Sequence, residues 1–157
     1  MVEPLSLTQS LDSDADEIAD VYLASRADAL PYLRRVHTDD EVRAWIREVA
    51  LQRCETWVGK QDRAIVGFVT LADEEVEQLY VLPGYYRRGI GTTLLNLAKT
   101  RRPKRLYLYT FQRNTSARAF YESQGFRIIA TSDGTRNEET EPDLLYQWTA
   151  ATRPLSR

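Results

Sequence analysis

The stretch YVLPGYYRRGIGTTLLNLA, residues 80–98, decides the fold of this chain. A Pro-Gly turn follows an apolar strand and precedes an apolar helix, and between turn and helix lie Arg87, Arg88, Gly89, Ile90, Gly91 and Thr92. Backbone N–H groups at a helix N-terminus lack intrahelical partners, and the helix dipole favours an anion there. Glycines at positions 89 and 91 remove the Cβ atoms that would keep a phosphate away. The pattern predicts a pyrophosphate site, although a tight turn alone also explains such a glycine pair.

Three other kinds of site do not fit this sequence. The stretch lacks the Lys-Ser/Thr pair of a P-loop. It also lacks the third glycine of a dinucleotide-binding turn and an acidic residue at the end of a following strand. His37 is the only histidine, so that neither a metal site nor a Ser-His or Cys-His triad is expected.

Composition excludes several classes of partner. The chain has 157 residues and a formal net charge of -2, which argues against general binding of nucleic acid. Cys54 is the only cysteine, so no internal disulfide is possible, which fits a reducing compartment. The first residues resemble no signal peptide, and no apolar run is long enough to span a bilayer. We therefore expect a cytoplasmic protein without a membrane partner.

Residue periodicity predicts one domain over residues 1–157 with the order β-α-α-β-β-β-α-β-α-β-β. The expected strands cover 3–9, 56–60, 64–72, 74–82, 104–111, 126–132 and 143–150. The expected helices run from Asp12 or Asp14 to Leu30, and over 37–52, 92–102 and 114–126. This order implies an α/β fold, a mixed sheet of six to seven strands with helices on both faces. In the strand before the glycine turn, strict alternation places Glu75, Glu77, Leu79 and Val81 on one face.

Two segments together resemble the GNAT family of acyl-CoA-dependent N-acetyltransferases. LYVLPGYYRRGIGTTLL, residues 79–95, is similar to the family's Arg/Gln-x-x-Gly-x-Gly/Ala pyrophosphate motif. LYTFQRNTSARAFYESQGF, residues 108–126, is similar to its Asn-x-Ala-x-x-Phe-Tyr-Glu-x-x-Gly-Phe motif. The resemblance covers essentially the whole chain and implies a mostly antiparallel sheet. Tyr86 departs from the pattern, because the family most often has Gln or Arg there, and this puts a side-chain contact from position 86 in doubt.

The resemblance implies direct transfer of an acetyl group from acetyl-CoA to a primary amine in a ternary complex, without a metal. The amine must lose a proton before it attacks, and a carboxylate is a natural base. Either Glu75 or Glu77 matches the family's strand glutamate, and the sequence does not decide between them. Tyr121 matches the tyrosine that donates a proton to the leaving thiolate.

The resemblance also implies how the pantetheine arm of the cofactor is held. Asn114 would bond to it or cap the helix, and the two roles are compatible. Backbone groups of Leu79 and Val81, in a strand that splays from its neighbour, would pair with it as a ligand-supplied strand.

The acceptor, small molecule or peptide, is left open. The acidic loop with Glu138, Glu139 and Asp143 favours a cationic amine slightly, and His37 lies near the expected acceptor pocket. Two alternatives remain: a catalytically silent acyl-CoA-binding sensor, and an interaction protein that uses the fold as a scaffold. Family members are often homodimers, but no residue here indicates one.

Overall fold

The computed structural model describes residues 4–151 of the chain. Its strands are β1 (Ser6–Gln9), β2 (Glu55–Gln61), β3 (Ala64–Ala72), β4 (Glu75–Val81), β5 (Arg105–Phe111), β6 (Arg127–Ser132) and β7 (Asp143–Thr149). Its helices are α1 (Ala15–Ala29), α2 (Asp39–Trp45), α3 (Leu51–Arg53), α4 (Ile90–Arg101) and α5 (Thr115–Ser123), with short turns η1 (Asp12–Asp14) and η2 (Ile46–Ala50). The predicted order of elements is confirmed, except that the second helix is divided and residue 3 lies outside the described residues. Within residues 4–151, no helix combines the length and the apolar character needed to cross a membrane.

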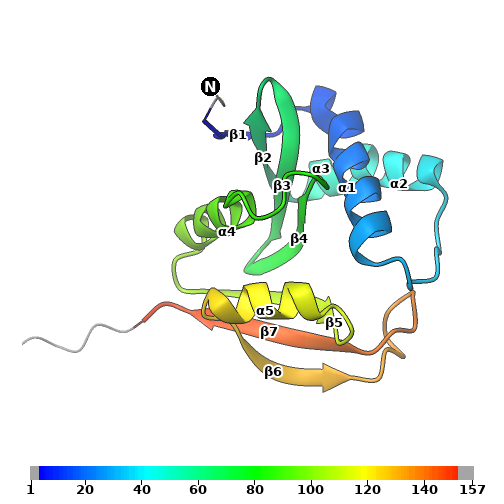
Figure 1. Cartoon of the computed structure of the whole chain (residues 1–157), viewed down its shortest axis with the longest axis vertical. Helices are drawn as coiled ribbons and strands as arrows, with labels where there is room; N and C mark the ends of the chain where they lie inside the picture. The colour runs from blue at the N-terminus through cyan, green and yellow to red at the C-terminus, as the bar shows by residue number, and fades with distance from the viewer. Residues whose placement is uncertain (1–3, 152–157) are drawn as a thin grey trace, which may run out of the picture.

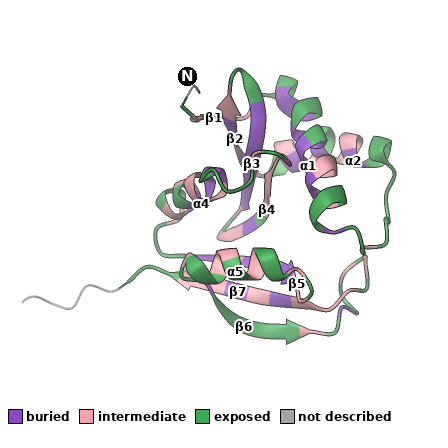
Figure 2. Ribbon diagram, in the orientation of Figure 1, coloured by how far each residue is buried: buried purple, intermediate pink, exposed green. Residues whose placement is uncertain are grey.

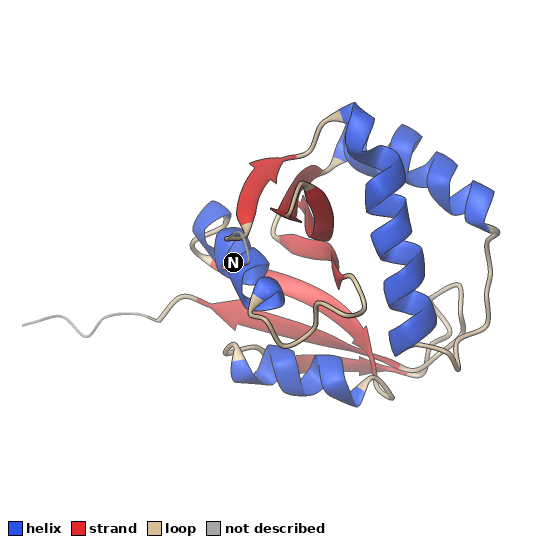
Figure 3. Cartoon of the chain, turned by 45° about the horizontal axis from the view of Figure 1, so that its top comes forward, coloured by secondary structure: helices blue, strands red, loops and turns tan. Residues whose placement is uncertain are grey.

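The strands form a seven-stranded sheet in the order β1-β2-β3-β4-β5-β7-β6. Every neighbouring pair is antiparallel except β4 and β5, which run parallel and pair at a single position, Glu75 with Tyr107. Helices α1 and α2 cover one face of β2–β4, and α4 covers the other, whereas α5 lies on β5 and β7 (Figures 1 and 3). The mixed α/β fold with helices on both faces is confirmed.

The strand β4 contains a β-bulge. Its pairing with β3 shifts by one residue, so that Glu77 is the extra residue. Strict alternation therefore breaks within the strand, and Val76 packs in the same core cluster as Leu79 and Val81. The expectation that the odd-numbered residues of 75–81 share one face is wrong, because that expectation assumed an unbroken ladder.

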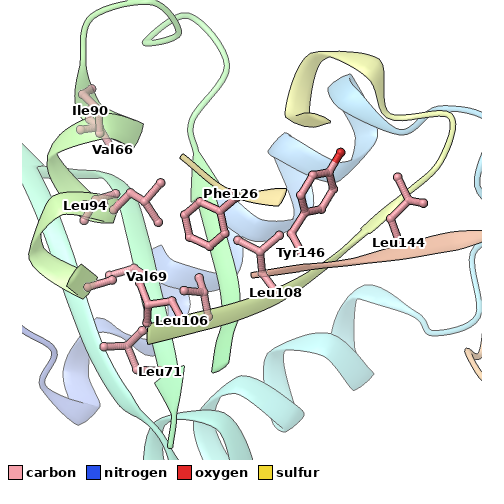
Figure 4. Close-up of a cluster of buried hydrophobic side chains, with 13 residues drawn as sticks. Val66, Val69, Leu71, Ile90, Leu94, Leu106, Leu108, Phe126, Leu144 and Tyr146 are labelled. Carbon is pink, nitrogen blue, oxygen red and sulfur yellow. The ribbon is translucent and has the colours of Figure 1, made fainter. Parts of the chain in front are cut away.

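The core lies on both faces of the sheet (Figure 2). Between the sheet and the helices α4 and α5, one cluster gathers side chains from several strands and helices (Figure 4). Leu94, Leu95 and Ala98 of α4 are fully buried in it. A Cβ atom at Gly67 of β3 would lie 3.1 Å from the side chains of Ile90 and Leu94, which is closer than ordinary van der Waals contact. Glycine at this position lets α4 pack directly on the backbone of β3, and this contact determines where the N-terminus of α4 lies.

A second cluster packs α1 and α2 against the opposite face, around Ile18, Val58 and Phe68. The helix α2 begins with a capping box, in which the Thr38 hydroxyl accepts from the Glu41 amide and the Glu41 carboxylate accepts from the Thr38 amide. The cap thus starts α2 where the chain returns to the sheet, and the second cluster holds the helix there.

Candidate active site

A cavity of about 1000 Å³ opens where β4 and β5 diverge. Its walls come from both strands, from α5, and from β6 and β7 with the loop between them. Glu77 and Leu79 of β4, Tyr121 of α5 and the α5 N-cap Asn114 all line it. The fold thus brings four of the sequence-predicted site residues to one space.

The backbone of β4 faces this gap at two residues. The Leu82 amide donates to the Val66 carbonyl at 2.7 Å, and by the alternation of an antiparallel ladder Leu79 and Val81 direct their N–H and C=O groups away from β3. The Ser25 hydroxyl donates to the Val81 carbonyl at 2.6 Å. A side chain of α1 thus already bonds to one lone pair of that carbonyl. The pairing of Leu79 and Val81 with the pantetheine arm stays a prediction.

The N-terminus of α4 has the geometry of an anion site. Gly89 is its N-cap with φ of 79°, and a Cβ atom there would have no heavy atom within 4 Å. The Thr93 amide donates to the Gly89 carbonyl at 2.9 Å, whereas the amides of the first turn have no partner inside the helix. A Cβ atom at Gly91 would lie 3.4 Å from the Phe120 ring, so this glycine also serves the packing of α4 on α5. These residues fit a pyrophosphate group.

The other residues of the glycine turn have different environments. Arg87 is exposed, with a left-handed φ of 63°. The Arg88 guanidinium lies 4.9 Å from the centre of the Tyr85 ring. Ile90 is 4% exposed and anchors the turn in the core, so that only its backbone could meet a ligand. Thr92 lies half-buried in the first turn.

Tyr121 lies on α5 among aromatic rings. Its ring centre is 5.2 Å from that of Phe120 and 5.7 Å from that of Phe126, a buried ring that Figure 4 shows beside Tyr146. Burial raises the pKa of Tyr121 above its ordinary value, and the neighbouring Tyr80 adds to the effect. Within residues 4–151 the Tyr121 hydroxyl makes no hydrogen bond. It is therefore a protonated donor at neutral pH on the wall of the cavity.

The position of Asn114 is compatible with both roles expected of it, capping α5 and contacting the pantetheine arm. Its side-chain oxygen accepts from the Ala117 amide at 3.2 Å and so caps α5, and its side chain also lines the cavity.

The two glutamates of β4 differ in position. Glu77 lines the cavity, whereas Glu75 does not. Burial, followed by the charge of Glu77, raises the pKa of Glu75. The Cys54 thiol donates to the Glu77 carboxylate at 3.3 Å, and burial and this bond raise the pKa of the thiol to about 12. No local pattern indicates the Cys54 contact, because it depends on how β2 and β4 lie across β3.

Comparison with known proteins agrees with this geometry. Residues 52–128 match the profile of the acetyltransferase (GNAT) domain. The chain is 29% identical over 138 residues to the peptidyl-lysine N-acetyltransferase YiaC of Escherichia coli, an alignment that covers 87% of this chain and 91% of YiaC. The chain belongs to the GNAT family. As a GNAT protein it is an acetyl-CoA-dependent acetyltransferase.

Solved structures share the GNAT fold of the chain. The solution structure of apo YjaB from Escherichia coli superposes with a TM-score of 0.79 at 22% identity, over 95% of this chain and all of YjaB. The PaiA N-acetyltransferase of Thermoplasma acidophilum, solved in complex with coenzyme A, gives a TM-score of 0.68 at 18% identity, over 94% of this chain and 99% of PaiA.

The acidic loop of this GNAT chain is paired internally. Glu139 bonds to Arg26 at 3.0 Å, and Glu138 to His37 at 2.8 Å. Hydrogen bonds to Glu138 and then to Glu41 raise the pKa of His37. The expectation that these carboxylates attract a cationic acceptor is thereby weakened, since Arg26 of α1 and His37 of the following loop already bond to them.

Arg26 and Tyr80 also meet at this site. Arg26 Nη1 donates to the Tyr80 hydroxyl at 3.2 Å, and Tyr80 lines the cavity. The two residues are 54 positions apart, and no sequence pattern indicates their contact. Within residues 4–151 no group of three or more His, Cys, Asp and Glu side chains is arranged to hold a metal ion.

Proposed function

We propose that the enzyme acetylates the side-chain amine of lysine in peptides or proteins, by direct attack of the amine on acetyl-CoA in a ternary complex. The observation that carries the proposal is that Glu77 and Tyr121, from separate elements, line one cavity where β4 and β5 diverge. The relative YiaC is named a peptidyl-lysine N-acetyltransferase, which supports the acceptor class. The lining charges support it too, because three carboxylates, Glu77, Asp133 and Asp143, line the cavity against one guanidinium, Arg136, and an excess of negative charge favours a cationic amine.

The chain offers a site for each part of the cofactor. Acetyl-CoA, when bound, supplies the acetyl group as an activated thioester. The first-turn amides of α4 beside Gly89 would hold the pyrophosphate, and Arg87 and Arg88 would add positive charge. The gap-facing backbone of Leu79 and the side chain of Asn114 would hold the pantetheine arm. The complex of PaiA with coenzyme A supports this interpretation.

The proposed proton transfers need two groups. Glu77 accepts a proton from the acceptor ammonium, directly or through a water molecule, and the freed amine bonds to the acetyl carbon as the C–S bond breaks. Tyr121 donates its proton to the leaving sulfur. The raised pKa of Tyr121 keeps that proton in place until the sulfur gains charge. The new amide nitrogen then releases its second proton to solvent, and the Tyr121 phenolate regains a proton from solvent. We also propose that residues 1–157 act as a single domain, which the shared sheet supports.

Steady-state kinetics with acetyl-CoA and lysine peptides test the proposal, with mass spectrometry to locate the acetyl group. Glu77→Gln should lower kcat by about 10²- to 10⁴-fold, because the base is lost. Glu75→Gln on the same strand is the matched control and should lower kcat much less. The reverse order of the two variants would assign the base to Glu75. Binding of acetyl-CoA without transfer to any amine would favour the silent sensor instead.

A further inference from the structure

A series of three polar side chains reaches the cavity from the side of α1. The oxygen of the Tyr80 hydroxyl accepts from Arg26 Nη1 at 3.2 Å, and Arg26 Nη2 donates to Glu139 Oε1 at 3.0 Å. The Arg26 guanidinium also lies 5.3 Å from the centre of the Tyr22 ring. The side chains of Arg26 and Glu139 are only 24% and 17% exposed. The position of the Tyr80 oxygen is therefore fixed from two other parts of the chain.

The Tyr80 ring is held as firmly as its oxygen. It packs edge-on against Tyr22 with ring centres 5.1 Å apart, and against Phe68 at 5.9 Å. Ring and hydroxyl therefore have one orientation, which a side chain at a recognition site requires.

The Tyr80 hydroxyl can donate a hydrogen bond as well as accept one. Within residues 4–151 its oxygen accepts from Arg26, but no group accepts the hydroxyl's own proton. A hydroxyl that accepts from a cation is polarised and becomes a stronger donor. Tyr80 lines the cavity, so an oxygen of a ligand there can accept this proton.

The position of this donor points to the acceptor rather than to the phosphates. Tyr80 packs with the cluster under α1 and α2, on the face of the sheet opposite α4 (Figure 1). A second cavity, of about 600 Å³, is lined by Arg26 and Glu139, and Leu30 lines both cavities. Tyr80, Arg26 and Glu139 thus stand where the two cavities meet, away from the glycine turn.

We propose that Tyr80 is a specificity-determining residue, whose hydroxyl donates a hydrogen bond to a carbonyl or carboxylate oxygen of the acceptor. The enzyme then prefers amines that carry such an oxygen over simple alkylamines. Arg26 and Glu139 are positioning residues, because they act through Tyr80. The inference rests on the proposed acetylation of lysine and adds to it a contact that selects the acceptor.

The test compares four acceptors that share a primary alkylamine but differ in their oxygens: Nα-acetyl-lysine methylamide, Nα-acetyl-lysine, lysine amide and n-pentylamine. Tyr80→Phe keeps the ring and removes only the hydroxyl. We expect it to raise KM about three- to tenfold for the lysine compounds, with kcat and the kinetics of n-pentylamine nearly unchanged. The compounds with and without a free carboxylate separate a carbonyl contact from a carboxylate contact.

Two further variants control the result. Tyr22→Phe removes a hydroxyl from the same aromatic cluster but leaves the contacts of the Tyr80 hydroxyl intact, and should behave as wild type. Arg26→Met combined with Glu139→Gln removes the ion pair as a unit, keeps the Tyr80 hydroxyl, and should give part of the KM rise. Thermal melts verify that each variant is folded.

The outcomes are distinguishable. If the wild type acetylates none of the four amines or any lysine peptide, the proposed function fails, and the inference with it. If it acetylates all four with equal kcat/KM, or if Tyr80→Phe leaves the KM for lysine compounds unchanged, only the inference fails. A fall in kcat at constant acceptor KM would also overturn it, since Tyr80 would then act on the reacting group.

Discussion

Replacing Gly89 with valine tests whether the N-terminus of α4 binds phosphate. Gly89 has a left-handed φ of 79°, and a Cβ atom there would stand in open space at the start of the helix. Gly84 shares both properties, with φ of 92° and no heavy atom within 4 Å of an added Cβ atom, but it lies in the preceding turn. Gly84→Val is therefore a matched control for the backbone strain.

The two variants should differ in binding but not in stability. A non-glycine residue in the left-handed region costs about 1–2 kcal/mol, and this cost applies to both. Valine at 89 also fills the open space at the start of α4, through which a phosphate would approach the first-turn amides. Each charge-assisted hydrogen bond contributes about 1.5–3 kcal/mol, so losing two of them raises the Kd for acetyl-CoA by about 10²- to 10⁴-fold.

Isothermal titration calorimetry with acetyl-CoA, and with adenosine 3′,5′-bisphosphate as a fragment that lacks the pantetheine arm, measures the difference. We expect near-wild-type affinity for Gly84→Val and a large loss for Gly89→Val, with similar melting temperatures for the two. Equal Kd values for the two variants would refute the phosphate site, and the glycine turn would then be only a turn.

Individual side chains give three more expected outcomes. Tyr121→Phe should lower kcat by about ten- to a thousandfold while the KM for acetyl-CoA is nearly kept, and unchanged turnover would remove Tyr121 from the acid role. Hydrogen bonds to Glu138 and Glu41 raise the pKa of His37. Their contribution to folding stability is complete below the unfolded pKa of about 6.5 and is lost as pH rises through the folded pKa. Urea unfolding should therefore separate wild type from His37→Gln more at about pH 6 than at about pH 8.5. A hydrogen bond from Arg101, with others from Trp57 and Arg102, lowers the pKa of Glu55 to about 2. The contribution of these bonds to folding stability is present above the unfolded pKa of about 4.3 and is lost as pH falls toward about 2. In acid titrations followed by circular dichroism, the stability deficit that Glu55→Gln shows at about pH 7 should therefore vanish near pH ~2.

Local patterns predicted the elements because local chemistry determines them. The glycine turn, the Asn114 cap and the Thr38 capping box each depend on residues within a few positions of one another. The two GNAT motifs likewise lie in continuous stretches, which is why the fold and the reaction class could be predicted from the sequence alone.

The remaining features depend on contacts between distant residues. The bulge at Glu77 reverses the faces of β4, and it is a property of the pairing with β3 rather than of β4 itself. Ser25 reaches the Val81 carbonyl across 56 positions, and Arg26 reaches Glu139 across 113. Periodicity carries no information on such contacts, so the sequence could not choose between Glu75 and Glu77 or identify Tyr80.

The single residue pair between β4 and β5 has a mechanical consequence. In the described part of the chain, the half-sheets β1–β4 and β5–β7 share no continuous ladder at this seam, and side chains such as Leu94, Leu106 and Phe126 join them instead. Non-directional contacts of this kind resist shear less than a row of hydrogen bonds does, so the seam is where the sheet yields first under load. A bound pantetheine arm would form backbone hydrogen bonds along that seam and so connect the two half-sheets. Amide hydrogen exchange at Leu79 should therefore slow on binding more than exchange within α4.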